Sequence, residues 1–347
     1  MAKDGLSHAW INHTFTTEPS VIALPKYLAA HNYRNPTDSE NSPWAYHMGV
    51  SFTGYLQANP EIFTHLSGLM KAKVEDTVPW FTTYPVDEMV KGCKPDGAIL
   101  VDIGGGTGRD IKTLAQHLGS EISPGRLILQ DLPSLVGEAK DLPSAVEAKG
   151  HDFFGEQPVK GARAYYMHNV LHDWSNAECQ KILTQIKEAM EPGYSRLLIN
   201  ETVLALSSAP MVRATDLLMM SVNAGAERTS EQWQELLTAA GFRNIQIHLS
   251  PGIDEGLIEA ELGYSVILEV PGIGSFRAGD RQQLLESDVA TYTCFPDIRT
   301  ALLVTGLVIS QPPLELVASL KLVHWDAAAE AKNHSARDVS LGRSVEV

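Results

Sequence analysis

From Asp96 onward, short apolar runs alternate with amphipathic segments of helical period. Each apolar run is followed by polar or glycine-containing residues, and the runs cover residues 98–102, 126–131, 164–167 and 196–200. A further candidate strand, 242–248, follows an expected helix at 230–240. This alternation predicts βαβ units and an α/β fold with a doubly wound, mainly parallel sheet. Ligands of such folds bind beyond the carboxyl ends of the strands.

The rest of the chain has a different pattern. Residues 1–90 form an N-terminal helical region, with turn signals between the candidate helices and with Ser42 and Pro43 as a cap followed by a first-turn proline. Residues 91–262 carry the βα alternation, and residues 263–347 show no clear rhythm. We expect this last region to be an extension that is partly disordered. The candidate helices of the first region are 25–30, 44–56 and 61–71.

Composition narrows the functional class. The formal net charge is −15 and no basic run stands out, which disfavours nucleic acid as a partner. The longest apolar run, 301–309, is far short of the roughly 20 residues that span a bilayer, so no membrane partner is expected. The N-terminus lacks the pattern of a secretory signal, and three widely separated cysteines suggest neither a disulfide framework nor a paired-cysteine zinc site. The expected location is cytoplasmic.

The run VDIGGGTG at 101–108 follows the first apolar segment and precedes an expected helix. Glycine has no Cβ and tolerates positive φ, so such a turn lets a ligand approach the backbone. A dinucleotide fingerprint needs glycine at the first, third and sixth places, and the sixth place counted from Gly104 is Arg109. NAD is therefore disfavoured. What remains is an acid followed by alternating glycines: Asp102, Gly104, Gly106 and Gly108.

Acidic residues also follow later strands. Asp131 ends the second strand, where doubly wound nucleotide-binding folds place an acid on the ribose hydroxyls. Alone, Asp131 is more typical of a strand end or a helix cap, but beside the glycine turn the binding interpretation is favoured. Asp152 and Phe153 can bind the amino group of an adenine and pack on its ring, although a turn Asp with two core phenylalanines explains the segment equally well.

The segment 165–178 carries a loop with His168 and His172, followed by a helix that starts after Ser175. Ser175 and Glu178 match a capping box, which fixes the helix start and holds the loop before it. An imidazole with a pKa near 6.5 can accept the proton of a phenol with a pKa of about 10 while a bond forms to the oxygen. His172 is therefore a candidate general base; a histidine that only satisfies hydrogen bonds at a helix start is the alternative.

Two carboxylates complete the set of candidate catalytic residues, and the histidines do not match a zinc motif. Glu201 follows the strand at 196–200 and Glu227 precedes the helix at 230–240; either can fix the tautomer of a catalytic imidazole, or be an ordinary surface acid. His168 and His172 are four residues apart, as zinc ligands on a helix can be, but neither an H-E-x-x-H motif nor a third ligand follows. We expect no metal site.

The ordered motifs VDIGGGTG, LILQDLP, HDFF, YYMHNVLHDWSNAEC, LLINETVL, GAERTSEQW and AAGF resemble the plant and fungal class of small-molecule O-methyltransferases, caffeate-type enzymes included. The resemblance implies a Rossmann-like class I methyltransferase sheet and S-adenosylmethionine as cofactor. It implies His172 as catalytic base, flanked by Glu201 and Glu227. The implied cofactor contacts are Asp102, Gly104, Gly106, Asp131, Asp152, Phe153 and His168, the last at a position that is usually lysine in plant members.

The resemblance also implies an acceptor, a phenolic hydroxyl of a small aromatic or polyketide-type secondary metabolite. Trp44, Phe63, Met70 and Trp80 of the helical region are candidates to line its pocket, although such a stripe is more often plain core. Two alternatives stay open. One is a methyltransferase-like pericyclase or dehydratase that holds the cofactor without methyl transfer, and the other is a truncated, inactive or regulatory binding protein.

Members of this class carry an N-terminal winged-helix dimerisation domain, and this sequence begins near the end of that domain. We therefore expect residues 1–90 to be a remnant of it that contributes to acceptor binding, and a homodimer to be weakened. The class usually ends near residues 257–262. The stretch 263–347 resembles no known motif, and a gene-prediction artefact, a disordered appendage and a small added module are the alternatives for it.

Overall fold

The computed structural model describes residues 11, 13–73, 78–119, 122–123, 126–249, 255–262, 266–270, 274–277 and 319–322. The chain divides into two compact units, Met1–Leu262 and Gly263–Val347. The second unit holds a three-stranded antiparallel sheet of order β10-β9-β11, with β9 at Val266–Val270, β10 at Gly274–Arg277 and β11 at Ser319–Leu322. The remainder of 263–347, where partial disorder was expected, lies outside the described residues.

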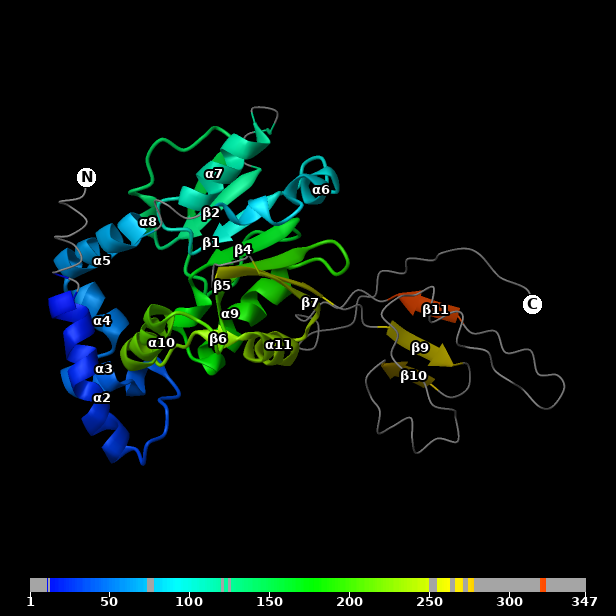
Figure 1. Ribbon diagram of the computed structural model, residues 1–347. Coiled ribbons are helices and arrows are strands. Elements are labelled where there is room, and N and C mark those ends of the chain that lie inside the picture. Colours follow the sequence, from blue (N-terminus) through cyan, green and yellow to red (C-terminus); the bar gives the residue numbers. More distant parts are fainter. Residues whose placement is uncertain are drawn as a thin grey trace. The chain divides into compact units, whose positions relative to one another are not determined.

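A central sheet organises the first unit (Figure 1). Its strands are β1 (Leu100–Ile103), β2 (Leu127–Asp131), β3 (Val146–Gly150), β4 (Ala164–His168), β5 (Arg196–Leu204), β6 (Arg228–Thr229), β7 (Phe242–Leu249) and β8 (Glu255–Leu262). The order is β3-β2-β1-β4-β5-β8-β7, and β6 pairs with β5. The first five strands run parallel, whereas β8 is antiparallel to both β5 and β7. The predicted doubly wound, mainly parallel α/β sheet is confirmed.

The inner strands β1, β2, β4 and β5 are largely apolar and buried because helices cover both faces of the sheet. Val101 and Ile103 point to one face, where they share a core with residues of α9 (Asn176–Ala189) and α11 (Ser230–Ala239). Leu100 points to the other face, where the core includes residues of α6 (Val86–Lys91) and α7 (Arg109–Leu118). Three strands of this sheet, β3, β6 and β8, were not predicted. The sequences of β3 and β8, VEAKG and EGLIEAEL, contain charged residues and lack the continuous apolar run of the inner strands. β6 has only two residues, Arg228 and Thr229, which is too short for a strand pattern.

The helices before the sheet are α2 (Glu18–Ala30), α3 (Pro43–Met48), α4 (Phe52–Ala58) and α5 (Pro60–Lys73), preceded by a π-helical turn at His13–Thr17. The helix expected at 25–30 begins earlier, with Pro25 inside it. The helix expected at 44–56 is two helices, because Gly49 ends the first in a left-handed conformation (φ 72°) and Ser51 caps the second. The cap at Ser42 is confirmed, since its side chain accepts the N–H of Ala45.

These helices pack against α10 (Pro210–Asn223), the helix between β5 and β6. Trp44 is fully buried there with Phe52 and Val222, and Trp80 is buried against Tyr166 in the sheet core. Both tryptophans are therefore core residues, which is the alternative to their lining a pocket for the acceptor. None of the helices in the described ranges is long and apolar enough to cross a membrane.

Candidate active site

The glycine turn lies at the carboxyl end of β1. Gly104, Gly106 and Gly108 all have positive φ, at 71°, 58° and 78°. A Cβ on Gly104 would lie 2.8 Å from Cγ2 of Val170, whereas a Cβ on Gly106 would meet no atom of the described residues within 4 Å. The turn is thus packed against the protein at Gly104 and open at Gly106, where a ligand can approach the backbone as the sequence predicts.

Two buried acids support this turn. Asp131 accepts the N–H of Gly106 at 2.8 Å with one oxygen and the N–H of Leu132 at 2.7 Å with the other. Burial raises the pKa of Asp131, and these two bonds partly offset that effect. Asp102 is 1% exposed, and its Oδ2 has no hydrogen-bond partner among the described residues. Burial, aided by the nearby Asp110, raises the pKa of Asp102 well above its ordinary value.

Asp152 and Phe153 follow β3, and Phe153 lies near the glycine turn. Asp152 is exposed and accepts the N–H of Phe154 at 3.0 Å, the geometry of the turn alternative. Phe153 lies beside the glycine turn, since a Cβ on Gly104 would approach its ring to 3.8 Å. The adenine contact of Asp152 stays a prediction.

His168, at the end of β4, is held between two carboxylates. Its Nδ1 contacts Asp110 in the first turn of α7, and its Nε2 contacts Glu255 at the start of β8. Burial lowers the pKa of His168, but the hydrogen bonds and charges of both carboxylates outweigh burial and raise it to about 10. The ring is therefore an imidazolium that ties the helix after the glycine turn to β8. Neither Asp110 nor Glu255 was identified from the sequence, because both lie far from His168 along the chain.

His172 sits in a short 3-10 helix, Leu171–Asp173, between β4 and α9. The predicted capping box is confirmed. The side-chain oxygen of Ser175 accepts the backbone N–H of Glu178, and the carboxylate of Glu178 accepts the backbone N–H of Ser175. Glu178 also accepts the hydroxyl of Ser39 at 2.7 Å. The N-terminal region therefore contacts the cap that holds the histidine loop.

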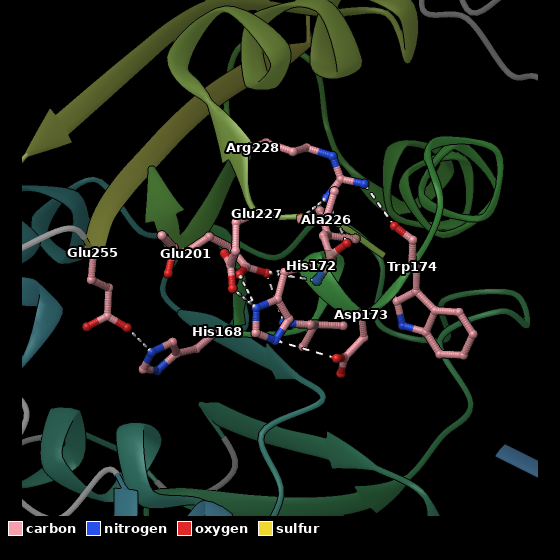
Figure 2. A network of polar contacts seen from close by, with 12 residues as sticks. His168, His172, Asp173, Trp174, Glu201, Ala226, Glu227, Arg228 and Glu255 are labelled. Carbon is pink, nitrogen blue, oxygen red and sulfur yellow. Dashed lines mark hydrogen bonds and ion pairs between the residues drawn. The ribbon is translucent and has the colours of Figure 1, made fainter. Parts of the chain in front are cut away.

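The structure brings His172, Glu227 and Glu201 together (Figure 2). Nδ1 of His172 is 3.0 Å from Oε1 of Glu227 and 3.7 Å from Oε2 of Glu201. Both carboxylates are buried, with exposed fractions of 3% and 0%. Glu201 also anchors the loop, because its Oε1 accepts the backbone N–H groups of residues 170, 171 and 172 at 2.9, 2.8 and 3.3 Å.

The electrostatics of the triad favour a charged imidazole. Burial lowers the pKa of His172, but Glu201, Asp173 and Glu227 together raise it to about 10. Burial raises the pKa of Glu201, with the imidazolium acting in the opposite direction. With Nδ1 engaged by Glu227, Nε2 is the remaining ring nitrogen, and it lies 3.6 Å from Oδ1 of Asp173.

One ligand atom each from His172, Glu201 and Glu227 lies within 4.8 Å of the others, a set that could hold a metal ion. A proton on the imidazole already places a positive charge between the two carboxylates. The expectation of no metal stays a prediction.

Comparisons with known proteins decide the family. Residues 38–243 match the family described as the O-methyltransferase domain. This chain belongs to that family. Among its fungal relatives, O-methyltransferase mfmE of Annulohypoxylon moriforme is 39% identical over 257 residues, which cover 73% of this chain and 63% of that protein. Demethylsterigmatocystin 6-O-methyltransferase of Aspergillus flavus is 35% identical over 247 residues, 70% of this chain and 62% of that protein.

Solved structures of similar proteins share this fold. The structure of LepI in complex with SAM matches with a TM-score of 0.69 and 28% identity, over 75% of this chain and 68% of that one. OxaC in complex with SAH and oxaline matches with a TM-score of 0.66 and 28% identity, over 73% and 65%. The chain spans somewhat less than two thirds of the length of the fungal relatives named above.

Proposed function

We propose that this protein transfers a methyl group from S-adenosylmethionine to a phenolic hydroxyl of a small aromatic or polyketide-type secondary metabolite. The observation that carries the proposal is the buried His172–Glu227–Glu201 triad, placed at the carboxyl edge of the sheet together with an open glycine turn. The names of the fungal relatives support the acceptor class. We place the enzyme in the cytoplasm, with a small-molecule substrate and without nucleic-acid or membrane partners.

The residues at the glycine turn fit the cofactor. Open space at Gly106 admits a ligand to the backbone, and the carboxylate of Asp131 lies beside it, since it accepts the N–H of Gly106. The unpartnered buried oxygen of Asp102 lies next to the same turn, 2.6 Å from where a Cβ on Gly105 would be. We assign cofactor binding to Asp102, Gly104, Gly106, Asp131, Asp152, Phe153 and His168. The bound cofactor supplies a methyl group that its positive sulfur has already activated.

His172 is the group that accepts the proton of the acceptor hydroxyl. Glu227 accepts the Nδ1 hydrogen of the imidazole, which fixes the tautomer and leaves Nε2 to take the proton of the acceptor hydroxyl. Neutral imidazole with a phenol and imidazolium with a phenolate contain the same number of protons. Because a phenol has a pKa of about 10 and that of His172 is raised to about 10, the two states are close in free energy. The two carboxylates therefore tune the base to its substrate, and alignment of oxygen, carbon and sulfur is the enzyme's remaining task.

A second function has one observation in its favour. An imidazolium between two carboxylates is also a proton donor, which is what a dehydratase or a pericyclase acting on a polar intermediate needs. Among the solved structures that are similar to this chain is one described as a pericyclic reaction enzyme, with a TM-score of 0.68 and 27% identity. In that reading the cofactor is bound but not consumed.

Two measurements separate these functions. Isothermal titration with S-adenosylmethionine should show binding at one site per chain; no binding would exclude both functions and leave a regulatory or inactive protein. Incubating the protein with a panel of phenols and the cofactor should then yield S-adenosylhomocysteine and methylated phenol in equal amounts. Substrate turnover without S-adenosylhomocysteine would favour the second function.

A further inference from the structure

Arg228 is a buried cation directly behind the catalytic triad. Its side chain is 2% exposed and packs over the ring of Trp233, with the guanidinium carbon 5.1 Å from the ring centroid. The guanidinium donates five hydrogen bonds in different directions: to the carbonyl oxygens of Leu171 (2.9 Å), Trp174 (2.8 Å) and Ala226 (3.3 Å), to Oδ1 of Asn176 (3.0 Å) and to Sγ of Cys179 (3.5 Å). Most of these partners flank His172 in sequence.

These bonds join two segments that are distant along the chain. His172 and Glu227 are 55 residues apart, and Arg228 follows Glu227 directly while Leu171 precedes His172. The backbone adds a second connection, because the N–H of Ala226 donates to the carbonyl oxygen of His172 at 2.9 Å. Figure 2 shows Arg228 above this junction, with Ala226 and Trp174 beside it.

The junction also has no spare room. A Cβ on Gly225 would lie 2.1 Å from the carbonyl oxygen of His172 and 2.8 Å from the carbonyl carbon of Asp173. Only glycine lets the two backbones approach this closely. The distance between the imidazole and Glu227 is thus set by backbone contact on one side and by the guanidinium on the other.

We propose that Arg228 is a positioning residue that sets the distance and orientation between His172 and Glu227. The inference rests on the proposed function, in which that pair moves the acceptor's proton. Arginine suits the task because its planar fork presents five donors at fixed angles, whereas lysine offers a single flexible nitrogen. Arg228 affects the reaction only through the position of His172, because its own contacts are carbonyl oxygens and neutral side chains.

The first test is the titration of His172, which does not depend on turnover. The groups that act on His172 are Glu201 from β5, Glu227, its neighbour Asp173, and, through Glu227, Asp216 of α10, whose carboxylate accepts the N–H of Glu227 at 2.9 Å. In Arg228→Lys, Glu227 is no longer held against the imidazole, so the pKa of His172 measured by NMR of ring-labelled histidine should fall by about one unit or more. Gly225→Ala should give a fall in the same direction with Arg228 intact.

The second test is kinetic. Arg228→Lys and Arg228→Gln should lower kcat roughly 10- to 100-fold, the cost of a misplacement near 1 Å, while cofactor affinity and acceptor KM stay within about twofold. Arg196→Gln is the matched control. It removes another arginine, paired with Glu259 and Glu261, from the opposite end of β5, so it should lower stability without moving the titration of His172.

Unchanged titration and kcat in Arg228→Lys would overturn the positioning role, and so would losses no larger than those of Arg196→Gln. If Arg228→Gln fails to fold, Arg228→Lys and Gly225→Ala decide the question. Should the wild-type protein methylate no phenol, the proposed function fails, yet the NMR titration still reports whether Arg228 controls the imidazole.

Discussion

The two glutamates beside His172 have different tasks. Glu201 commits one oxygen to three backbone N–H groups and so holds the loop, while Glu227 meets the imidazole directly at 3.0 Å. Both raise the pKa of His172 against the opposing effect of burial. Removing the charge of Glu227 therefore changes the base itself, with little direct effect on how the loop is anchored.

We predict that Glu227→Gln lowers the pKa of His172, because a neutral amide stabilises the imidazolium less than a carboxylate does. Since the neutral imidazole is the base, the rise of kcat/KM with pH should move to lower pH than in the wild type. The maximal rate should drop roughly 10- to 100-fold as the tautomer is no longer held. The measurement is the pH profile of kcat/KM, with cofactor affinity as the control. If the rise of kcat/KM occurs at the same pH in the variant and the wild type, Glu227 does not act on His172.

At the scale of elements, the glycine turn combines two kinds of glycine. A side chain on Gly104 would collide with Val170, whereas one on Gly106 would project into the open space assigned to the cofactor. Both have positive φ, so a substitution adds roughly 1–2 kcal/mol of backbone strain at either position. Gly119, at the far end of α7, also has a positive φ (78°, with ψ −172°), and a Cβ there would meet no described atom within 4 Å, so a substitution at Gly119 adds backbone strain without a collision.

We therefore predict that Gly106→Ala weakens S-adenosylmethionine binding at least about tenfold, measured by calorimetry, with a loss of unfolding free energy no larger than that of Gly119→Ala. Gly104→Ala should lose more stability than either, because the collision adds to the strain. Equal cofactor affinity in Gly106→Ala and Gly119→Ala would show that the ligand does not approach the backbone there.

Much of this element-scale picture was predictable. The inner strands were found because burial on both faces makes them continuously apolar, and the capping box before α9 follows from two residues three positions apart. β3 and β8 were missed because their charged residues break the apolar pattern, and β6 was missed because it has only two residues. The break at Gly49 was missed although the sequence marks it, since glycine is the usual left-handed residue after a helix and Ser51 is a typical N-cap for the next one. Asp110, Glu255 and Arg228 could not be found, since only the folded sheet brings them to the histidines.

At the scale of the whole molecule, two partly buried histidines link folding to pH. The pKa values of His168 and His172 are both raised to about 10, from an ordinary value near 6.5. A group whose pKa is raised by folding contributes stability that is fully present below its unfolded pKa and is lost as pH rises through its folded pKa. Stability from both imidazolium ions is therefore lost between about pH 6.5 and pH 10.

We predict that the unfolding free energy, measured by urea denaturation, declines steadily across this window. The net charge of −15 also disfavours the folded state at high pH, so His168→Lys is the informative comparison. Lysine keeps its charge to higher pH than histidine, and this variant should show a shallower decline than the wild type. Identical slopes would mean that His168 is not an imidazolium in the folded protein.

The central claim is that His172 accepts the acceptor's proton during methyl transfer, and mass spectrometry tests it most directly. Wild-type protein and His172→Ala, each shown by calorimetry to bind S-adenosylmethionine, are incubated with the phenol that the wild type methylates and with cofactor labelled in its methyl group. We predict a labelled methyl group on the phenol with the wild type and a loss of rate of at least about a hundredfold in the variant. Equal product from both proteins would contradict the role of His172 as the base.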